Sequence, residues 1–118
     1  MVMLRDLMSR HIEAVGPDEL FTEAARRMEV LNVSLLPVCE GRHLVGALTR
    51  RHLDQARGRG PRFTPRVRVR DVMIRDVVCG ADTQDVKDAL RIMRAKKLGV
   101  LPVVDAGRDL VGIFALGI

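Results

Sequence analysis

A run of polar side chains that begins three residues after Gly46 suits the binding of a phosphorylated ligand. Thr49 supplies a hydroxyl, and Arg50 and Arg51 supply two adjacent guanidinium groups. Guanidinium groups bind phosphate oxygens through charge-assisted and often paired hydrogen bonds. Thr49 also suits a helix start, because its hydroxyl can accept from a backbone N–H of the first turn. The run therefore predicts a site for phosphate at the start of a helix.

His52 follows this run and has two interpretations. A neutral imidazole at this position could form a hydrogen bond with a ligand hydroxyl. The side chain could also simply be an exposed residue in the first turn of a surface helix. The residue type leaves both interpretations open.

The sequence contains no recognisable catalytic or metal-binding pattern. It lacks a G-x-S-x-G sequence, a P-loop and an H-E-x-x-H sequence. His11 and His43 have no histidine four residues away. Cys39 and Cys79 lie in separate apolar runs, which favours small buried thiols in a reduced, cytoplasmic protein. We expect a protein that is not an enzyme and that holds no metal.

Length and composition favour one compact, cytoplasmic unit. The chain has 118 residues and a net charge of +5. A chain of this size can bury about two thirds of its unfolded surface, so it needs no metal or disulfide to fold. Its apolar runs are far shorter than the roughly 20 residues that span a bilayer. Its first residues lack the pattern of an export signal. We therefore expect no membrane insertion.

The candidate site belongs to one of two copies of a repeated unit. Three short sequences recur: Arg5-Asp6-Leu7-Met8 as Arg70-Asp71-Val72-Met73, Leu36-Pro37-Val38 as Leu101-Pro102-Val103, and Leu44-Val45-Gly46 as Leu110-Val111-Gly112. The register slips once, at the extra residue Ala106. Because a repeated unit usually buries its apolar face against its copy, we expect the functional surface at the seam between the copies.

We divide the chain into a first repeat at residues 1–57, a linker at 58–68 and a second repeat at 69–118. The linker is rich in arginine, glycine and proline, which is typical of a connecting segment of mixed stiffness. Its charge indicates either a solvated connection or a contact with the phosphates of a nucleic acid. Nucleic acid is the less favoured partner, because the chain has three aromatic residues and none is Trp or Tyr.

Periodicity predicts the order strand, helix, strand, strand, helix. The first copy should contain a strand at 12–15, a helix with Phe21, Ala24, Ala25, Met28 and Leu31 inward, a hairpin of 33–39 and 43–48, and a helix at 49–57. The second should contain a strand at 77–79, a helix at 82–97 capped by Asp82 or Thr83, and a hairpin of 100–104 and 110–114. Residues 4–8 should form one helical turn. We expect the final helix of the second copy to be missing.

The shared order of these sequences resembles the cystathionine β-synthase (CBS) domain, in the tandem arrangement called a Bateman module. The resemblance rests on Arg-Asp-(Leu/Val)-Met, the amphipathic helix, Leu-Pro-Val, Gly-Arg and Leu-Val-Gly, and covers nearly the whole chain. It implies an α/β (α+β) fold of two βαββα repeats. These would be related by a pseudo-twofold axis and form one compact module with ligand clefts between the copies.

The resemblance also implies where a ligand would bind. The family's ribose signature, Gly-x-x-(Thr/Ser)-x-x-Asp, falls on Thr49 and His52 in the first copy and on Ala115 and Ile118 in the second. Ala115 and Ile118 offer no side-chain hydrogen bond to a ribose or phosphate. We therefore expect the ligand in the first copy, at a site formed by Ile12, Ala14, Val15, Leu36, Pro37, Thr49, Arg50, Arg51 and His52.

The resemblance implies a regulatory, ligand-sensing module. AMP, ADP, ATP or S-adenosylmethionine would be the regulatory ligand, and no cofactor would be required. The module would form a homodimer and control a fused or associated enzyme, channel or transporter. The missing aspartate in both copies favours an alternative, a dimerising interaction module without a ligand. Binding of nucleic acid through the linker is a third and less favoured function.

Overall fold

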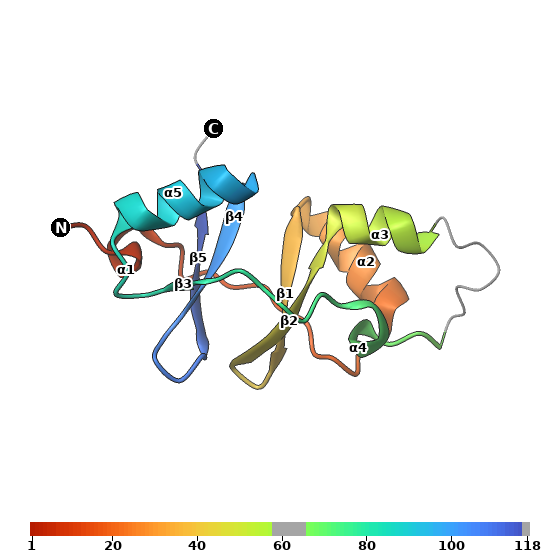
Figure 1. Ribbon diagram of the computed structural model, residues 1–118. Coiled ribbons are helices and arrows are strands. Elements are labelled where there is room, and N and C mark those ends of the chain that lie inside the picture. The colour runs from red at the N-terminus through yellow and green to blue at the C-terminus, as the bar shows by residue number, and fades with distance from the viewer. Residues whose placement is uncertain (58–65, 117–118) are drawn as a thin grey trace. The chain divides into compact units, whose positions relative to one another are not determined.

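The computed structural model describes residues 1–57 and 66–116, apart from the side chains of His52, Gln55, Ala56 and Arg57. Most of the arginine-rich linker predicted at 58–68 lies outside the described residues. The described chain is a mixture of helices and strands, which confirms the α+β fold class (Figure 1). It divides into two compact units, which are described individually below.

Neither unit is a continuous stretch of sequence. Unit 1 contains Met1–Ile12, Arg42–Leu44 and the described residues of Val78–Ile118, and unit 2 contains Glu13–Gly41 and the described residues of Val45–Val77. Each unit therefore combines the strands of one sequence repeat with the lead-in segment of the other. The short helix α1 (Leu4–Leu7) belongs to unit 1, and the equivalent helix α4 (Val69–Val72) belongs to unit 2.

Unit 2 is a hairpin with helices packed against it. Its elements are α2 (Phe21–Leu31), β1 (Leu35–Glu40), β2 (His43–Thr49, its first two residues grouped with unit 1), α3 (Arg50–Arg57) and α4. The turn between β1 and β2 contains Gly41 at φ 60°, a conformation that favours glycine. The strand predicted at 12–15 is wrong in extent, because only Val15 pairs, in a single parallel bridge to Val38. Pro17, which lacks an N–H, follows it closely and cannot extend the ladder.

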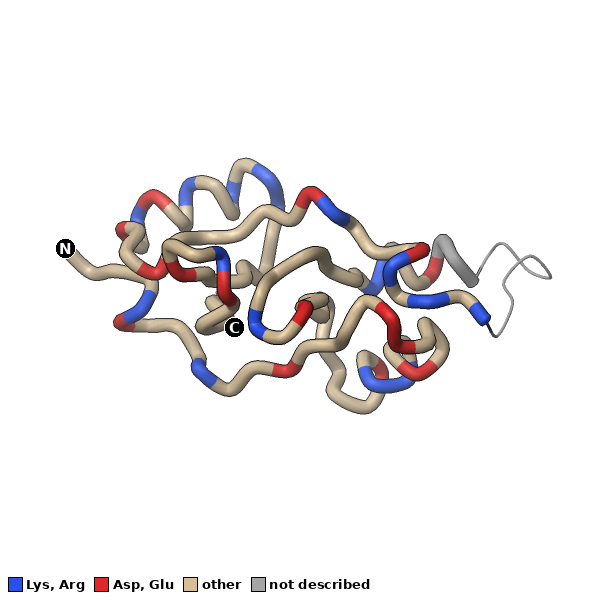
Figure 2. Tube along the Cα trace, turned by 90° about the horizontal axis from the view of Figure 1, so that it is seen from below, with Lys and Arg blue, Asp and Glu red and all other residues tan. Residues whose placement is uncertain are grey.

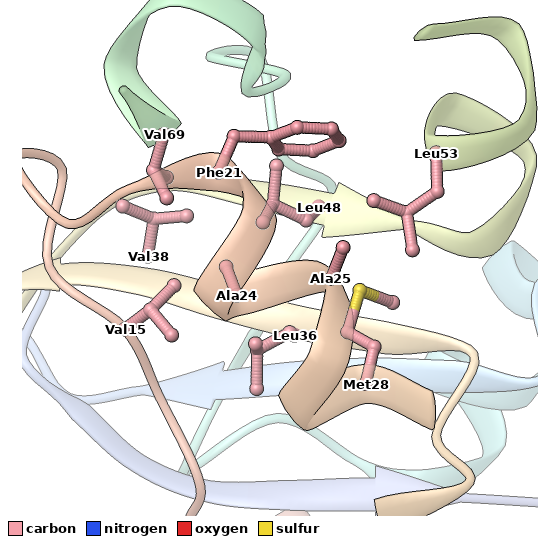
Figure 3. Packing of buried hydrophobic residues seen from close by; sticks show 10 residues of the cluster. All are labelled: Val15, Phe21, Ala24, Ala25, Met28, Leu36, Val38, Leu48, Leu53 and Val69. Carbon is pink, nitrogen blue, oxygen red and sulfur yellow. The ribbon is translucent and has the colours of Figure 1, made fainter. Parts of the chain in front are cut away.

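The core of unit 2 lies between α2, the strands and α3 (Figure 3). Four predicted inward residues of α2 are buried, and they pack with strand, α3 and α4 residues: Phe21, Ala24, Ala25, Met28, Val15, Leu36, Val38, Leu48, Leu53 and Val69. Leu31 is 37% exposed, so its predicted inward position is wrong. Leu31 is the last residue of α2, and the chain leaves the helix at Asn32 with φ 54°.

Unit 1 contains a three-stranded sheet in the order β3-β4-β5. Its elements are α1, β3 (Gly80–Ala81), α5 (Val86–Lys96), β4 (Val100–Val104) and β5 (Leu110–Ala115). β3 pairs parallel to β4 and β5 pairs antiparallel to it. The strand predicted at 77–79 is therefore wrong in position. Glycine and alanine are poor strand formers, so β3 has no local signal in the sequence.

Helix α5 begins later than the sequence predicts. Asp85 is its N-cap, and Oδ1 of Asp85 accepts from the Lys87 backbone N–H at 2.9 Å. Neither Asp82 nor Thr83 caps the helix. The N–H of Asp82 instead donates to the carbonyl of Val104 at 2.9 Å, which holds this residue at the sheet.

The core of unit 1 lies between α5 and the sheet and includes a leucine from the other repeat. Its buried residues are Leu4, Ala89, Met93, Leu101, Val103 and Phe114. Leu4, from α1, is fully buried.

The two cysteines differ in burial. Cys39 is 8% exposed, as predicted. Cys79 is only half-buried, so its predicted full burial is wrong. It lies in the irregular segment before β3, with Nη1 of Arg108 4.0 Å from its Sγ.

Candidate functional site

The predicted phosphate site lies where β2 passes directly into α3. Thr49 is the last residue of β2, and Arg50 is the first residue of α3. The Thr49 side chain is half-buried, whereas Arg50 and Arg51 are exposed. A hydroxyl, two guanidinium groups and the first turn of a helix therefore share one end of unit 2. Helix starts and guanidinium groups both favour anions.

Arg50 is held by the segment that follows α2. Its backbone N–H donates to the carbonyl of Ser34 at 3.1 Å. Its Nη2 donates to Oδ1 of Asn32 at 3.2 Å and to the carbonyl of Val33 at 3.3 Å. The end of α2 therefore fixes the direction of this guanidinium group.

Sequence reasoning missed Asn32 as a partner of Arg50. A signal for it existed, because asparagine is common at the left-handed residue that ends a helix. Asn32 directly follows the last residue of α2 and adopts that conformation, with φ 54°. The signal marks the end of the helix, however, and does not say that the amide side chain will meet an arginine 18 residues later.

The guanidinium group of Arg51 is uncommitted, which means that no other residue of the described chain binds it. Within residues 1–57 and 66–116, no hydrogen bond or ion pair engages its side chain. It can therefore meet a ligand phosphate without breaking an existing contact, unlike Arg50. His52 is the third residue of α3, and its side chain lies outside the described residues. Its two interpretations stay predictions.

The other predicted ligand residues divide between the two units. The Val15 N–H donates to the carbonyl of Pro37 at 3.0 Å, which brings these two segments together in unit 2. The side chains of Val15, Leu36 and Pro37 are buried. Ala14 is half-buried in unit 2, and Ile12 is half-buried in unit 1.

Met73 and Ile74 of the second repeat, here called the strap, hold β2 just before the junction. Ala47 and Ile74 exchange two backbone hydrogen bonds of 2.9 Å. The Met73 side chain lies over Gly46, where a Cβ would come within 2.7 Å of Met73 Sδ and 2.8 Å of the Ile74 carbonyl oxygen. Only glycine allows this close approach. The strap thus fixes β2 three residues before Thr49.

Unit 1 has no equivalent polar junction among its described residues. β5 ends at Ala115, which occupies the repeat position of Thr49, and Leu116 occupies the position of Arg50. The Leu116 N–H donates to the carbonyl of Gly99 at 2.9 Å, which repeats the backbone hydrogen bond of Arg50. The backbone connection is the same in both units, but here it presents a methyl and an isobutyl group. Position 118, the last of the family signature, lies outside the described residues.

The described chain contains neither a metal-ligand cluster nor a helix that could span a membrane. Residues 1–57 and 66–116 contain no group of three or more His, Cys, Asp or Glu side chains placed to hold a metal ion. In the same two ranges, no helix combines the length and the apolar character needed to cross a bilayer.

Comparison with known sequences places both repeats in one family. Residues 4–58 and 69–117 each match the model of the CBS domain. The chain is 36% identical over 120 residues to the CBS domain-containing protein YhcV of Bacillus subtilis, which covers 99% of this chain and 82% of YhcV. It is 32% identical over 112 residues to inosine-5'-monophosphate dehydrogenase of Methanocaldococcus jannaschii, covering 94% of this chain. The match spans only 21% of the dehydrogenase.

Comparison with solved structures gives the same result. The crystal structure of CBSX2 in complex with AMP matches with a TM-score of 0.86 at 26% identity, covering 98% of this chain and 90% of that one. The tandem matches and the shared fold confirm the resemblance that the repeated sequences predicted. The chain belongs to the CBS domain family and contains two CBS segments in tandem.

Proposed function

We propose that this chain is a regulatory module that binds an adenine nucleotide at the β2–α3 junction of unit 2. One observation carries the proposal: the half-buried Thr49 and the uncommitted Arg51 guanidinium flank the start of α3. CBSX2, which shares the fold, was crystallised with AMP. The module is not itself an enzyme in this proposal, and it acts as a homodimer on a fused or associated protein.

The charge of the junction favours AMP, ADP or ATP over S-adenosylmethionine. Arg51 would meet a phosphate oxygen, the Thr49 hydroxyl would bond a ribose or phosphate oxygen, and the first turn of α3 would face the negative charge. S-adenosylmethionine carries a sulfonium cation in place of the phosphate, and a guanidinium group repels it. The effect on a partner is limited by the difference in nucleotide affinity between the module's two states.

Calorimetric titration of the full chain with AMP, ADP, ATP and S-adenosylmethionine tests the proposal. We expect heat with at least one nucleotide and a weaker response or none with S-adenosylmethionine. Arg51→Gln should weaken nucleotide binding by about 10-fold to 100-fold, the value of a hydrogen bond to a charged group. Arg26→Gln is the matched control, because Arg26 is an exposed helix arginine outside the junction. Absence of heat with all four ligands, or equal affinities for the two variants, contradicts the proposal.

The alternative is a dimerising module without a ligand, and exposed apolar side chains on α2 favour it. Val30 is 79% exposed and Leu31 is 37% exposed at the end of this helix. Exposed apolar residues close together often mark a contact surface. Mass measurement in solution distinguishes the two functions. A dimer that forms equally well with and without each nucleotide supports the alternative, and a monomer excludes it.

A further inference from the structure

The outer face of α5 carries a row of basic side chains that its counterpart in unit 2 lacks. Lys87, Arg91 and Arg94, here called the basic stripe, are all exposed and follow the helical spacing of four and three residues. Figure 2 colours the Lys and Arg positions blue along the chain trace. Side chains at this spacing lie on one face of a helix. At 1.5 Å per residue the stripe is about 10 Å long. Three cations therefore stand in line along nearly two turns.

Helix α2 provides an internal comparison at the equivalent positions. The repeat register places Thr22, Arg26 and Glu29 where α5 has the basic stripe. The central arginine contacts an acid three residues earlier in both helices, at 3.2 Å in α2 and 3.4 Å in α5. The difference in charge between the rows on α2 and α5 thus comes from the first and third residues of each row. The row on α2 has no net charge, whereas the row on α5 has three positive charges.

Two of the three cations of the basic stripe have no ion pair within the described chain. In residues 1–57 and 66–116, neither Lys87 nor Arg94 forms an ion pair through its side chain. Lys96 and Lys97, at the end of the same helix, are also exposed. A large single-sign field of this kind favours association with the opposite charge.

Another exposed residue of α5, an isoleucine, also differs between the two units. Ile92 is 37% exposed on α5. Its counterpart on α2 is Arg27, which contacts Glu13 at 3.3 Å and Glu19 at 3.8 Å. Unit 2 therefore uses this position for internal ion pairs, whereas unit 1 presents an apolar side chain to solvent. Ile92 directly follows Arg91 in the sequence, so it lies on another face of α5, and the basic stripe alone indicates an acidic partner.

We propose that the outer face of α5 is a docking surface for an acidic protein segment of the regulated partner. Carboxylates spaced one helical turn apart would meet Lys87, Arg91 and Arg94. The partner's role rests on the proposed function, but the surface and its charge do not depend on nucleotide binding. Complementary charge sets the register and raises the rate of such an encounter.

The surface fits protein better than nucleic acid. Affinity for nucleic acid grows with the number of phosphates neutralised, and three aligned cations neutralise few. Single strands also need aromatic side chains for stacking, and Phe114, the aromatic residue of the described part of unit 1, is only 9% exposed. An acidic helix needs only a few contacts of the spacing that α5 provides.

Fluorescence anisotropy with a labelled synthetic helical peptide tests the docking surface. The peptide carries glutamates spaced by four and three residues, and a second peptide has glutamine in place of each glutamate. We expect the full chain to bind the glutamate peptide and not the glutamine peptide. The double variant Lys87→Thr/Arg94→Glu gives α5 the residue types of α2, and it should bind about tenfold more weakly or worse.

A charge-matched variant separates position from net charge. Arg26→Thr/Arg75→Glu removes the same charge from exposed sites of unit 2 and should keep the peptide affinity within about twofold. Equal losses in the two double variants overturn the proposal, as does tighter binding of a labelled duplex DNA through the same α5 residues. AMP titration of both variants keeps the two proposals apart. Loss of peptide binding with intact AMP binding supports the surface, and absence of AMP binding contradicts only the nucleotide site.

Discussion

Units 1 and 2 use the same backbone contacts but present different chemistry. In unit 1, Ser9 and Ile113 exchange backbone hydrogen bonds of 2.8 and 2.9 Å, and the Met8 side chain covers Gly112. Unit 2 repeats this strap with Met73 over Gly46. Beyond the strap the units diverge, because unit 2 offers a hydroxyl and guanidinium groups where unit 1 is apolar.

The outer helices α2 and α5 also differ, but here it is unit 1 that presents the charged side chains. Unit 2 neutralises the charges of α2 internally, whereas unit 1 exposes the basic stripe of α5. The residues that match between the repeats are those that hold strands and helices together. The residues that differ lie at the β2–α3 junction and on the outer faces. In our proposals, unit 2 therefore binds the small ligand and unit 1 binds the protein partner.

The largest predicted effect concerns the exchange of lead-in segments between the repeats. Leu4 comes from the first repeat but is fully buried in the core of unit 1. Leu4→Ala should lower the free energy of unfolding by about 2–5 kcal/mol, because it removes core contacts and leaves a cavity. Urea unfolding followed by circular dichroism measures the change. Leu7→Ala, at a 58% exposed site of the same short helix, is the control. Equal effects of the two variants would mean that α1 does not belong to this core.

A smaller effect tests whether the two straps are equally tight. Gly46→Ala should cost about 1–3 kcal/mol, because its Cβ would lie 2.8 Å from the Ile74 carbonyl oxygen, which is fixed by hydrogen bonds. Gly112→Ala meets mainly the Met8 side chain, and its nearest backbone atom is 3.0 Å away. Thermal unfolding of both variants measures the difference.

Double variants sharpen this comparison of the straps. Met8→Ala should relieve much of the cost of Gly112→Ala, since a flexible side chain is the obstacle. Met73→Ala should relieve less of the cost of Gly46→Ala, because the Ile74 carbonyl remains in place. Equal rescue in both units would contradict the proposed difference.

The next prediction concerns the junction of β2 and α3. Thr49→Val keeps the shape of the side chain and removes its hydroxyl, so AMP affinity should fall by about tenfold. Calorimetry measures the affinity. Ala115→Thr, at the equivalent position of unit 1, should leave it unchanged. If Ala115→Thr creates a second AMP site, the units differ by less than we propose.

The smallest predicted effect concerns an ion pair that only unit 2 possesses within the described chain. Arg70 Nε donates to Oδ1 of Asp18 at 2.7 Å, and Arg68 Nη1 donates to the Asp18 carbonyl at 3.0 Å. The repeat equivalents in unit 1 are Arg5 and Thr83. Asp18→Asn should cost about 0.2–1 kcal/mol, because the pair is exposed, and less at high salt. Urea unfolding at low and high salt measures this loss in the free energy of unfolding. An equal loss at both salt concentrations would contradict the prediction.

The sequence predicted the repeats and the helices well, because their signals are local. The buried faces of α2 and α5 follow the helical period, and the lead-in at residues 4–8 forms the expected turn as α1. The exchange of lead-in segments was not predictable. Nothing in the residue types around Leu4 says which set of strands will bury it.

The candidate site was predictable only in part for the same reason. The order Thr49, Arg50, Arg51 is visible in the sequence, and so is the helix that follows. The contact between Arg50 and Asn32 joins residues 18 positions apart and appears only when β1 and β2 bring them together. That contact holds Arg50 and leaves Arg51 for a ligand, a distinction that the sequence alone does not show.

Hydrogen–deuterium exchange with and without AMP tests the inequality of the two units most directly. We expect AMP to slow amide exchange at residues 49–51 and near Val15 and Pro37 in unit 2. Exchange at Ala115 and Leu116 in unit 1 should stay unchanged. Equal protection of the two regions, or protection confined to unit 1, would contradict the claim that unit 2 holds the nucleotide.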